Sequence, residues 1–195
     1  MSPLTKIHPV VVPVPEADRR LIGRSRVETL SRRAREALNH SARYSGHRLG
    51  PLLKDDRGAP KPCNGLYWSL THKTHYVAAV TAPHRVGIDI ERVKPCNSGL
   101  YARIADPAEW ALASTVSLPL FFRFWTAKEA VLKAASSGLA GLSRCRVHKI
   151  VDHNLIELAY DDKIWTVTQR WIEDDHIVAV TTSNDEVRWH VASLK

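Results

Sequence analysis

Residues 86–91 read Val-Gly-Ile-Asp-Ile-Glu and are the most informative segment of the chain. Side chains on a β-strand alternate between its two faces, so Ile88 and Ile90 are expected in the core while Asp89 and Glu91 stand together on the opposite face. Two neighbouring carboxylates repel each other unless a cation lies between them. The stretch therefore predicts a strand that either carries a metal site or simply exposes alternating polar residues.

Helical and strand patterns follow one another in blocks on both sides of this stretch. A strand over residues 77–81 and a tight turn over 82–85 would form a hairpin with the 86–91 strand. The valine-proline segment at residues 10–14 suits an edge strand or a loop. Helical spacing covers residues 16–38, 101–113 and 120–135, and a β-meander is predicted from strands at 147–151, 155–160, 163–171, 176–182 and 187–192.

Both halves of the chain run helix first and antiparallel strands afterwards. We therefore expect an α+β fold of two similar lobes, residues 1–95 and 96–195. The first lobe would hold a basic helix, a loop and the hairpin that ends in Asp89 and Glu91; the second would hold a helix and the meander. Glycines and prolines between residues 46 and 62 predict a long loop that serves as a lid or a connector.

The composition favours a soluble cytoplasmic protein with an anionic partner. Lysine and arginine exceed aspartate and glutamate by 28 to 20, which gives a formal charge of +8 and fits nucleic acid, a phosphorylated cofactor or an acidic protein. Three widely spaced cysteines without a Cys-x-x-Cys favour neither a disulfide framework nor a zinc ribbon. No apolar run approaches the ~18 residues of a membrane helix, so membrane insertion and secretion are not expected.

A third carboxylate occurs in residues 124–134, which read Phe-Trp-Thr-Ala-Lys-Glu-Ala-Val-Leu-Lys-Ala. On a helix Glu129 and Lys133 lie one above the other, as in an ordinary surface ion pair. Combined with the 86–91 carboxylates, they indicate a Mg²⁺ site, because Mg²⁺ binds a few carboxylates and completes its shell with water and substrate phosphates. His72 could donate to such a phosphate, although a lone loop histidine usually has no specific role.

Several segments together resemble one enzyme family. Residues 87–91, and residues 125–130 with Lys133, are similar to the two signature motifs of 4'-phosphopantetheinyl transferases, in the family's order and at about its spacing. Residues 69–72 (Ser-Leu-Thr-His) resemble its Asn-Leu-Ser-His segment, and residues 109–110 its intermediate Glu element. The resemblance spans roughly residues 58–141. It departs from the family where residues 58–62 read Gly-Ala-Pro-Lys-Pro instead of Gly-Lys-Pro, and where serine replaces the usual asparagine.

The resemblance implies a set of site residues and a monomeric, longer type of enzyme whose two lobes enclose one site. Mg²⁺ would be held against the pyrophosphate of coenzyme A, with cationic groups on its phosphates and one carboxylate, or a water held by the acidic cluster, as the base. The implied metal ligands are Asp89, Glu91 and Glu129. The implied catalytic residues are Glu129, Lys133 and, as a weaker candidate, Glu109. The residues implied to contact coenzyme A are His72, Lys133, Lys61, Thr71, Arg26 and Arg33.

The implied reaction moves phosphopantetheine from coenzyme A onto a serine of an acidic acyl or peptidyl carrier protein, with neither nucleic acid nor a membrane as partner. Two alternatives share some of these features. A Mg²⁺-dependent nuclease also needs clustered carboxylates and a lysine, although its usual acid and lysine are two apart on a strand. A basic nucleic-acid-binding module would use the seven arginines between residues 19 and 35, but no module signature accompanies them.

Overall fold

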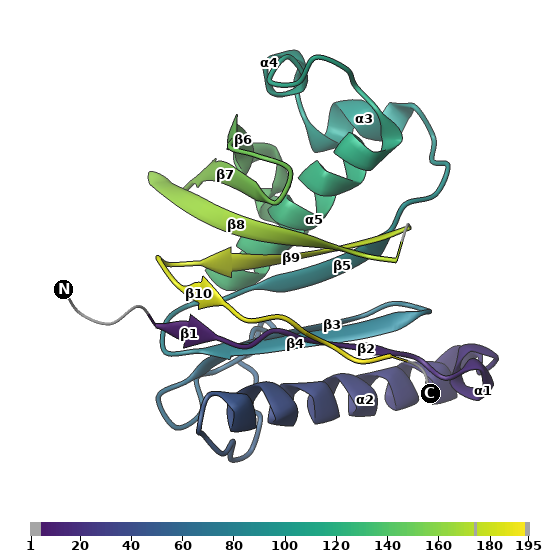
Figure 1. The fold of residues 1–195 in the computed structure, drawn as a ribbon, viewed down its shortest axis with the longest axis vertical. Coiled ribbons are helices and arrows are strands. Elements are labelled where there is room, and N and C mark those ends of the chain that lie inside the picture. The colour runs from purple at the N-terminus through teal and green to yellow at the C-terminus, as the bar shows by residue number, and fades with distance from the viewer. Residues whose placement is uncertain (1–4, 174, 194–195) are drawn as a thin grey trace.

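The structure, a computed structural model, describes residues 5–173 and 175–193 and combines helices with largely antiparallel sheets (Figure 1). A four-stranded sheet has the order β11-β2-β4-β3 and a five-stranded sheet the order β5-β9-β8-β7-β6. The first consists of β11 (His190–Val191), β2 (Val10–Pro13), β4 (Tyr76–Ala82) and β3 (Tyr67–His72). The second consists of β5 (Ile88–Arg92), β9 (His176–Thr182), β8 (Lys163–Ile172), β7 (Leu155–Tyr160) and β6 (Arg146–Ile150).

One long helix packs against each sheet. Helix α2 (Gly23–Tyr44) covers the four-stranded sheet, and α5 (Leu118–Ala135) packs on the five-stranded sheet. The short elements are α1 (Glu16–Arg19), α3 (Gly99–Ile104), α4 (Pro107–Trp110) and the 3-10 helix η1 (Leu139–Arg144). None of the helices in the described part of the chain is both long and apolar enough to cross a membrane.

Local capping explains where the helices begin. The Ser117 hydroxyl accepts a hydrogen bond from Leu120 N and starts α5. The helix expected over residues 101–113 divides in two because Asp106 and Glu109 form a capping box at the start of α4, with Pro107 at its first position. The helix expected over residues 16–38 is likewise divided, into α1 and α2.

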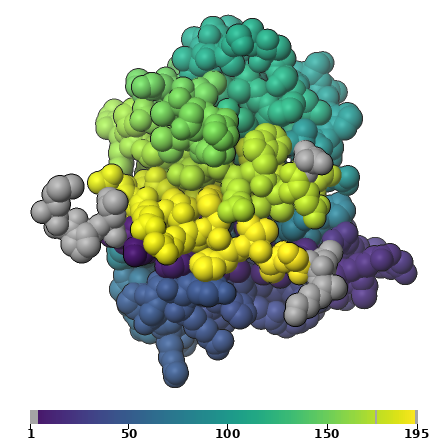
Figure 2. All heavy atoms as spheres, in the orientation of Figure 1, coloured from purple at the N-terminus to yellow at the C-terminus, as the bar shows by residue number. Residues whose placement is uncertain are grey.

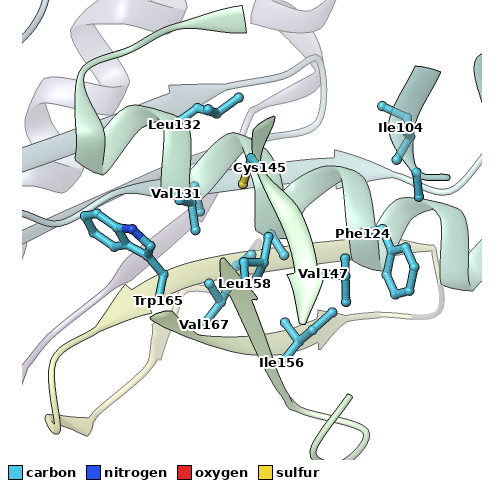
Figure 3. Packing of buried hydrophobic residues seen from close by; sticks show 14 of the residues in the cluster. Ile104, Phe124, Val131, Leu132, Cys145, Val147, Ile156, Leu158, Trp165 and Val167 are labelled. Atoms are coloured by element: carbon cyan, nitrogen blue, oxygen red, sulfur yellow. The ribbon is translucent and has the colours of Figure 1, made fainter. Parts of the chain in front are cut away.

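Apolar side chains form three layers of core. One lies between α2 and the four-stranded sheet, one between the two sheets, and one between α5 and the five-stranded sheet. Figure 3 shows the last of these, with Phe124 of α5 beside Val147 and Val131 of α5 directed toward Leu158 of the sheet. Ile88 and Ile90 are fully buried in the layer between the sheets, which confirms the face predicted for them.

Three predictions about strand pairing are wrong. Strand β4 forms its hairpin with β3, whereas β5 pairs with β9 in the other sheet. Strand β2 is internal rather than an edge, because β11 pairs with it in parallel. The predicted last strand does not extend the meander: it forms β10 (Glu186–Val187), which pairs with β1 (Lys6–Ile7), and β11. Alternation reveals which face of a strand is buried but not which strand lies beside it.

The two halves of the chain therefore exchange strands across the boundary expected near residue 95. Strand β5 precedes that boundary but belongs to the sheet of the second half, and β10 and β11 return to strands of the first half. In the space-filling view of Figure 2 the residues near the C-terminus, in yellow, lie across the face shown, between α2 and the strands of the second half. This exchange places the Asp89 strand beside both β3 and α5.

Candidate active site

Helix α5 comes unusually close to the start of β5 at Gly87. A Cβ atom at this position would lie 1.9 Å from Ala130 O and 2.7 Å from Ala134 N, both of them backbone atoms. Only glycine fits such an approach. The close packing brings the polar face of β5 against the face of α5 that carries Glu129 and Lys133, so two segments about 40 residues apart form one site.

Asp89 lies at the centre of this site and is 2% exposed. Its Oδ1 atom accepts hydrogen bonds from Thr71 Oγ1 at 2.9 Å and from Lys133 Nζ at 2.7 Å. Its Oδ2 atom is buried and has no hydrogen-bond partner among the described residues. An unsatisfied buried carboxylate oxygen is costly, so this atom is a place for a cation or for a donor from a bound molecule.

Two further carboxylates adjoin Asp89. Glu91 Oε1 accepts hydrogen bonds from Lys73 Nζ at 2.5 Å and from Trp125 Nε1 at 3.1 Å. Glu129 forms no ion pair with any residue that the structure describes. Burial, and next the charge of Asp89, raises the pKa of both Glu91 and Glu129. Glu91 and Glu129 thus resist ionising beside Asp89 unless positive charge is added.

Two lysines supply part of that charge. Lys133 Nζ also donates to Ile88 O at 3.1 Å, which fixes it beside the strand. Burial works to lower the pKa of Lys73, but the carboxylates of Asp89 and Glu91 outweigh it and raise that pKa. With three carboxylates and two ammonium groups, the cluster carries a formal charge of −1, so one divalent cation would make it positive.

Strand β3 presents a row of polar side chains to β5. Ser69 Oγ accepts a hydrogen bond from Ile88 N at 3.1 Å, and Thr71 and Lys73 meet the next two acidic positions of β5. These three residues are two apart, so they share one face of the β3 segment. The serine that replaces the family's usual asparagine therefore binds the edge of β5. Polar residues at every second position were the sequence signal by which Lys73 could have been found.

A basic pocket opens beside the cluster. It has a volume of about 350 Å³ and adjoins a second pocket of about 270 Å³ that reaches Glu129. The loop between residues 46 and 62 supplies part of both walls, and its backbone is tied to β3 where Trp68 Nε1 donates to Lys61 O at 2.8 Å. The cationic side chains around the two pockets are Lys54, Arg57, Lys61, Arg85 and Lys133.

The carboxylates are suited to a metal ion for which the protein supplies only part of the coordination shell. The described residues contain no group of three His, Cys, Asp or Glu side chains placed to enclose an ion. The free Asp89 Oδ2 and the unpaired Glu129 carboxylate are nevertheless oxygen ligands of the kind that Mg²⁺ takes, and Mg²⁺ commonly completes its shell with waters and phosphates. The site fits a Mg²⁺ ion that arrives with a phosphate ligand.

Comparison with known proteins places this geometry in a family. Residues 85–181 match the family model of the 4'-phosphopantetheinyl transferase superfamily. Over 184 residues the chain is 32% identical to enterobactin synthase component D of Salmonella typhimurium, and the matched segment covers 87% of this chain and 77% of that protein. The chain belongs to the 4'-phosphopantetheinyl transferase superfamily.

Two further members of the superfamily match shorter segments. The chain is 36% identical over 120 residues to 4'-phosphopantetheinyl transferase HetI of Nostoc sp., which covers 53% of this chain. It is 35% identical over 139 residues to 4'-phosphopantetheinyl transferase PptT of Mycobacterium tuberculosis, which covers 65% of this chain. The chain spans 50% of the length of HetI and 59% of that of PptT.

Not every residue that the superfamily resemblance implied lies at the cluster. Arg33 forms an ion pair with Asp18 that ties α2 to α1. The Thr71 hydroxyl is buried and donates to Asp89, so it orients that carboxylate and does not face the pocket. In this structure Arg33 is engaged in an ion pair and Thr71 supports Asp89, and the contacts to coenzyme A expected of these two residues stay predictions.

Glu109, the weaker of the expected catalytic residues, is held in a buried ion pair. Its carboxylate is buried and pairs with Lys128 Nζ at 2.6 Å, while Val147 N and Asp106 N donate to its two oxygens. Lys128 itself donates to Ile104 O at 2.5 Å. Both oxygens of Glu109 thus accept hydrogen bonds, and the pair with Lys128 fastens α5 to α4 and β6.

His72 and Arg26 lie on the other side of β3, next to α2. Both line a cleft of about 410 Å³ that Lys73 and Glu91 also border, and Arg26 donates to Thr74 Oγ1. Burial, followed by the charges of Lys133 and Lys73, lowers the pKa of His72. The imidazole is therefore neutral near pH 7 and can donate one N–H to an anion.

Proposed function

We propose that the chain transfers 4'-phosphopantetheine from coenzyme A to a serine of an acyl or peptidyl carrier protein. The observation that carries the proposal is Asp89, buried with one oxygen that has no partner among the described residues and held between Thr71 and Lys133, the latter of which lines a basic pocket. Membership of the superfamily supports the reaction, as do the names of HetI and PptT, which are both called 4'-phosphopantetheinyl transferases.

Mg²⁺ would be held by Asp89, Glu91 and Glu129. When bound, the ion would neutralise the charge of the coenzyme A pyrophosphate. Without a cation the cluster repels phosphate, since its formal charge is −1. Lys133 would donate to the same phosphates, and its second contact, to Ile88 O, keeps it pointing along β5. In phosphoryl transfer, positioning and charge neutralisation supply most of the rate gain.

The reaction needs a base for the carrier serine. The serine Oγ forms a bond to the β-phosphorus as the bond from that phosphorus to the bridging oxygen breaks, and adenosine 3',5'-bisphosphate leaves with that oxygen. Glu129 accepts the serine proton, either directly or through a water held by the cluster. Its pKa is raised by burial and by Asp89, and it has no ion pair in the described residues to compete for its lone pairs.

The nucleotide of coenzyme A would occupy the basic pockets beside Lys133. Lys61 and its neighbours on the 46–62 loop offer cations for phosphate groups, and the loop serves as a wall over the ligand. His72, neutral near pH 7, donates to a phosphate from the β3 side, and Arg26 adds positive charge to the same cleft. These contacts extend the proposal beyond the acidic cluster.

The fold and the charge suggest how the partner arrives. We regard α2 with its sheet and α5 with its sheet as two similar lobes that enclose one site in a monomer. A net charge of +8 would attract a carrier protein that is acidic around its serine and raise the rate of association. The three free cysteines, Cys63, Cys96 and Cys145, suit a reducing cytoplasm.

Intact-mass spectrometry of carrier proteins tests the proposal. Several apo carriers are incubated with the chain, coenzyme A and Mg²⁺, with and without EDTA. We expect at least one carrier to gain the mass of one phosphopantetheine, and EDTA to abolish the gain. No gain on any carrier, together with no binding of coenzyme A, would contradict the proposal and leave the nuclease and the nucleic-acid-binding module to be tested.

A further inference from the structure

Lys73 contacts the acidic cluster from a rigid position. It directly follows β3, and its backbone N–H donates to Tyr76 O at 2.8 Å in the turn that joins β3 to β4. The Nζ atom lies 2.5 Å from Glu91 Oε1, an oxygen that also accepts from Trp125. The turn is short, so the base of the side chain cannot move far, while the long side chain itself can.

The surroundings of Lys73 are those of a cation site. Asp89, Glu91 and Glu129 all act on its charge, and their attraction outweighs the cost of burial. The side chain is still 37% exposed, because it also borders the cleft of about 410 Å³ next to α2. Electrostatic attraction therefore holds the Lys73 ammonium at Glu91, and the cleft provides space into which the side chain can move.

We propose that Lys73 is a tethered cation that occupies the Glu91 side of the metal site and is displaced when the divalent ion binds. The inference rests on the metal site of the proposed function. An ammonium group and a divalent ion at the same carboxylate repel each other strongly. The Lys73 ammonium, 2.5 Å from Glu91 Oε1, already offsets the negative charge that a metal ion would meet there, so binding of the ion works against that contact.

Displacement couples the ion to the phosphate ligand. With the ion bound, three carboxylates, two ammonium groups and two metal charges give the cluster a formal charge of +1 instead of −1. The released Lys73 ammonium then needs an anion, and a phosphate group in the site provides one. The metal ion and the phosphate ligand each favour the binding of the other, so the site binds the ion only weakly when no phosphate ligand is present.

The test measures Mn²⁺ binding without any phosphate ligand. Free Mn²⁺ is followed by electron paramagnetic resonance with the wild-type chain, Lys73→Met and Lys73→Arg. We expect Lys73→Met to bind Mn²⁺ about tenfold more tightly, which corresponds to ~1.4 kcal/mol and is the size of one charge-assisted hydrogen bond. Lys73→Arg keeps the tethered charge and is expected to bind Mn²⁺ as the wild-type chain does. In EDTA, Lys73→Met should melt at a lower temperature, because Glu91 loses its counter-ion.

Lys94→Met is the matched control for net charge. Lys94 lines the same cleft, yet the structure gives it no ion pair with a described residue. Its variant should stay within about twofold of the wild-type affinity. Equal Mn²⁺ affinity of Lys73→Met and the wild-type chain, or an equal gain in Lys94→Met, would overturn the inference and leave the proposed function standing. Absence of Mn²⁺ binding in every variant would overturn both the inference and the proposed metal site.

Discussion

Replacement of Gly87 by alanine tests how the site is assembled. The new Cβ atom would lie 1.9 Å from Ala130 O, so α5 must retreat by about 1.5 Å to restore an ordinary contact of 3.4 Å. Overpacking of this kind costs about 1–3 kcal/mol, and the upper end applies because backbone atoms cannot rotate away. For a chain of this length ~3 kcal/mol lowers the melting temperature by about 6–12 °C.

The same retreat acts on the chemistry. Lys133 Nζ lies 2.7 Å from Asp89 Oδ1, and a shift of α5 breaks that contact. Misplacement by about 1 Å can cost about 100-fold in rate, so Gly87→Ala should lose transfer activity even at temperatures where it is folded. Urea denaturation and carrier-transfer rates measure the two effects. Gly99→Ala is the control, because its new Cβ would meet a single side-chain atom, Asn97 Oδ1 at 3.2 Å. A Gly87→Ala chain as stable and as active as Gly99→Ala would refute the reasoning.

Two other predictions follow from the buried carboxylates. Glu109→Ala and Lys128→Met each leave one buried charge unpaired, so each should lower the free energy of unfolding, measured in urea, by about 3–5 kcal/mol. The double variant should lose much less than the sum of the two single losses. Additive losses would show that the two residues are not coupled. Glu129 has a native pKa above its ordinary value of 4.5, so its charge opposes folding of the metal-free chain. In EDTA, Glu129→Gln should therefore raise the melting temperature at neutral pH, and the gain should vanish as the pH falls through the raised pKa toward 4.5; a gain independent of pH would contradict the assignment.

The local features of the fold could be predicted from sequence because they depend on neighbouring residues. Alternation in residues 86–91 gave the buried face of Ile88 and Ile90. The helical spacing of residues 120–135 predicted α5, which spans Leu118–Ala135, and the period of two located β6 to β9. The pairing of β5 with β9 could not be predicted, since the partner strand lies about 90 residues away and any strand with a complementary face satisfies the same pattern.

The site was predicted in part for similar reasons. Asp89, Glu129 and Lys133 belong to motifs whose spacing on a strand or a helix fixes their direction. The structural contacts of Glu109 could have been predicted, because an aspartate three residues earlier, followed by proline, is the signature of a capping box. Lys73 was missed because the alternation of polar residues along β3 indicates only which face they share, whereas the contact of Lys73 with Glu91 depends on β3 lying beside β5.

The central claim is that Asp89 serves the transfer reaction whereas Glu109 serves the fold. The most direct test follows the formation of holo carrier protein by intact-mass spectrometry at saturating coenzyme A and Mg²⁺, with the wild-type chain, Asp89→Asn and Glu109→Gln compared at a temperature where all three are folded. We predict that Asp89→Asn loses at least about 100-fold in rate while Glu109→Gln stays within a few-fold of the wild-type chain. Near-normal transfer by Asp89→Asn, or a loss confined to Glu109→Gln, would contradict the account.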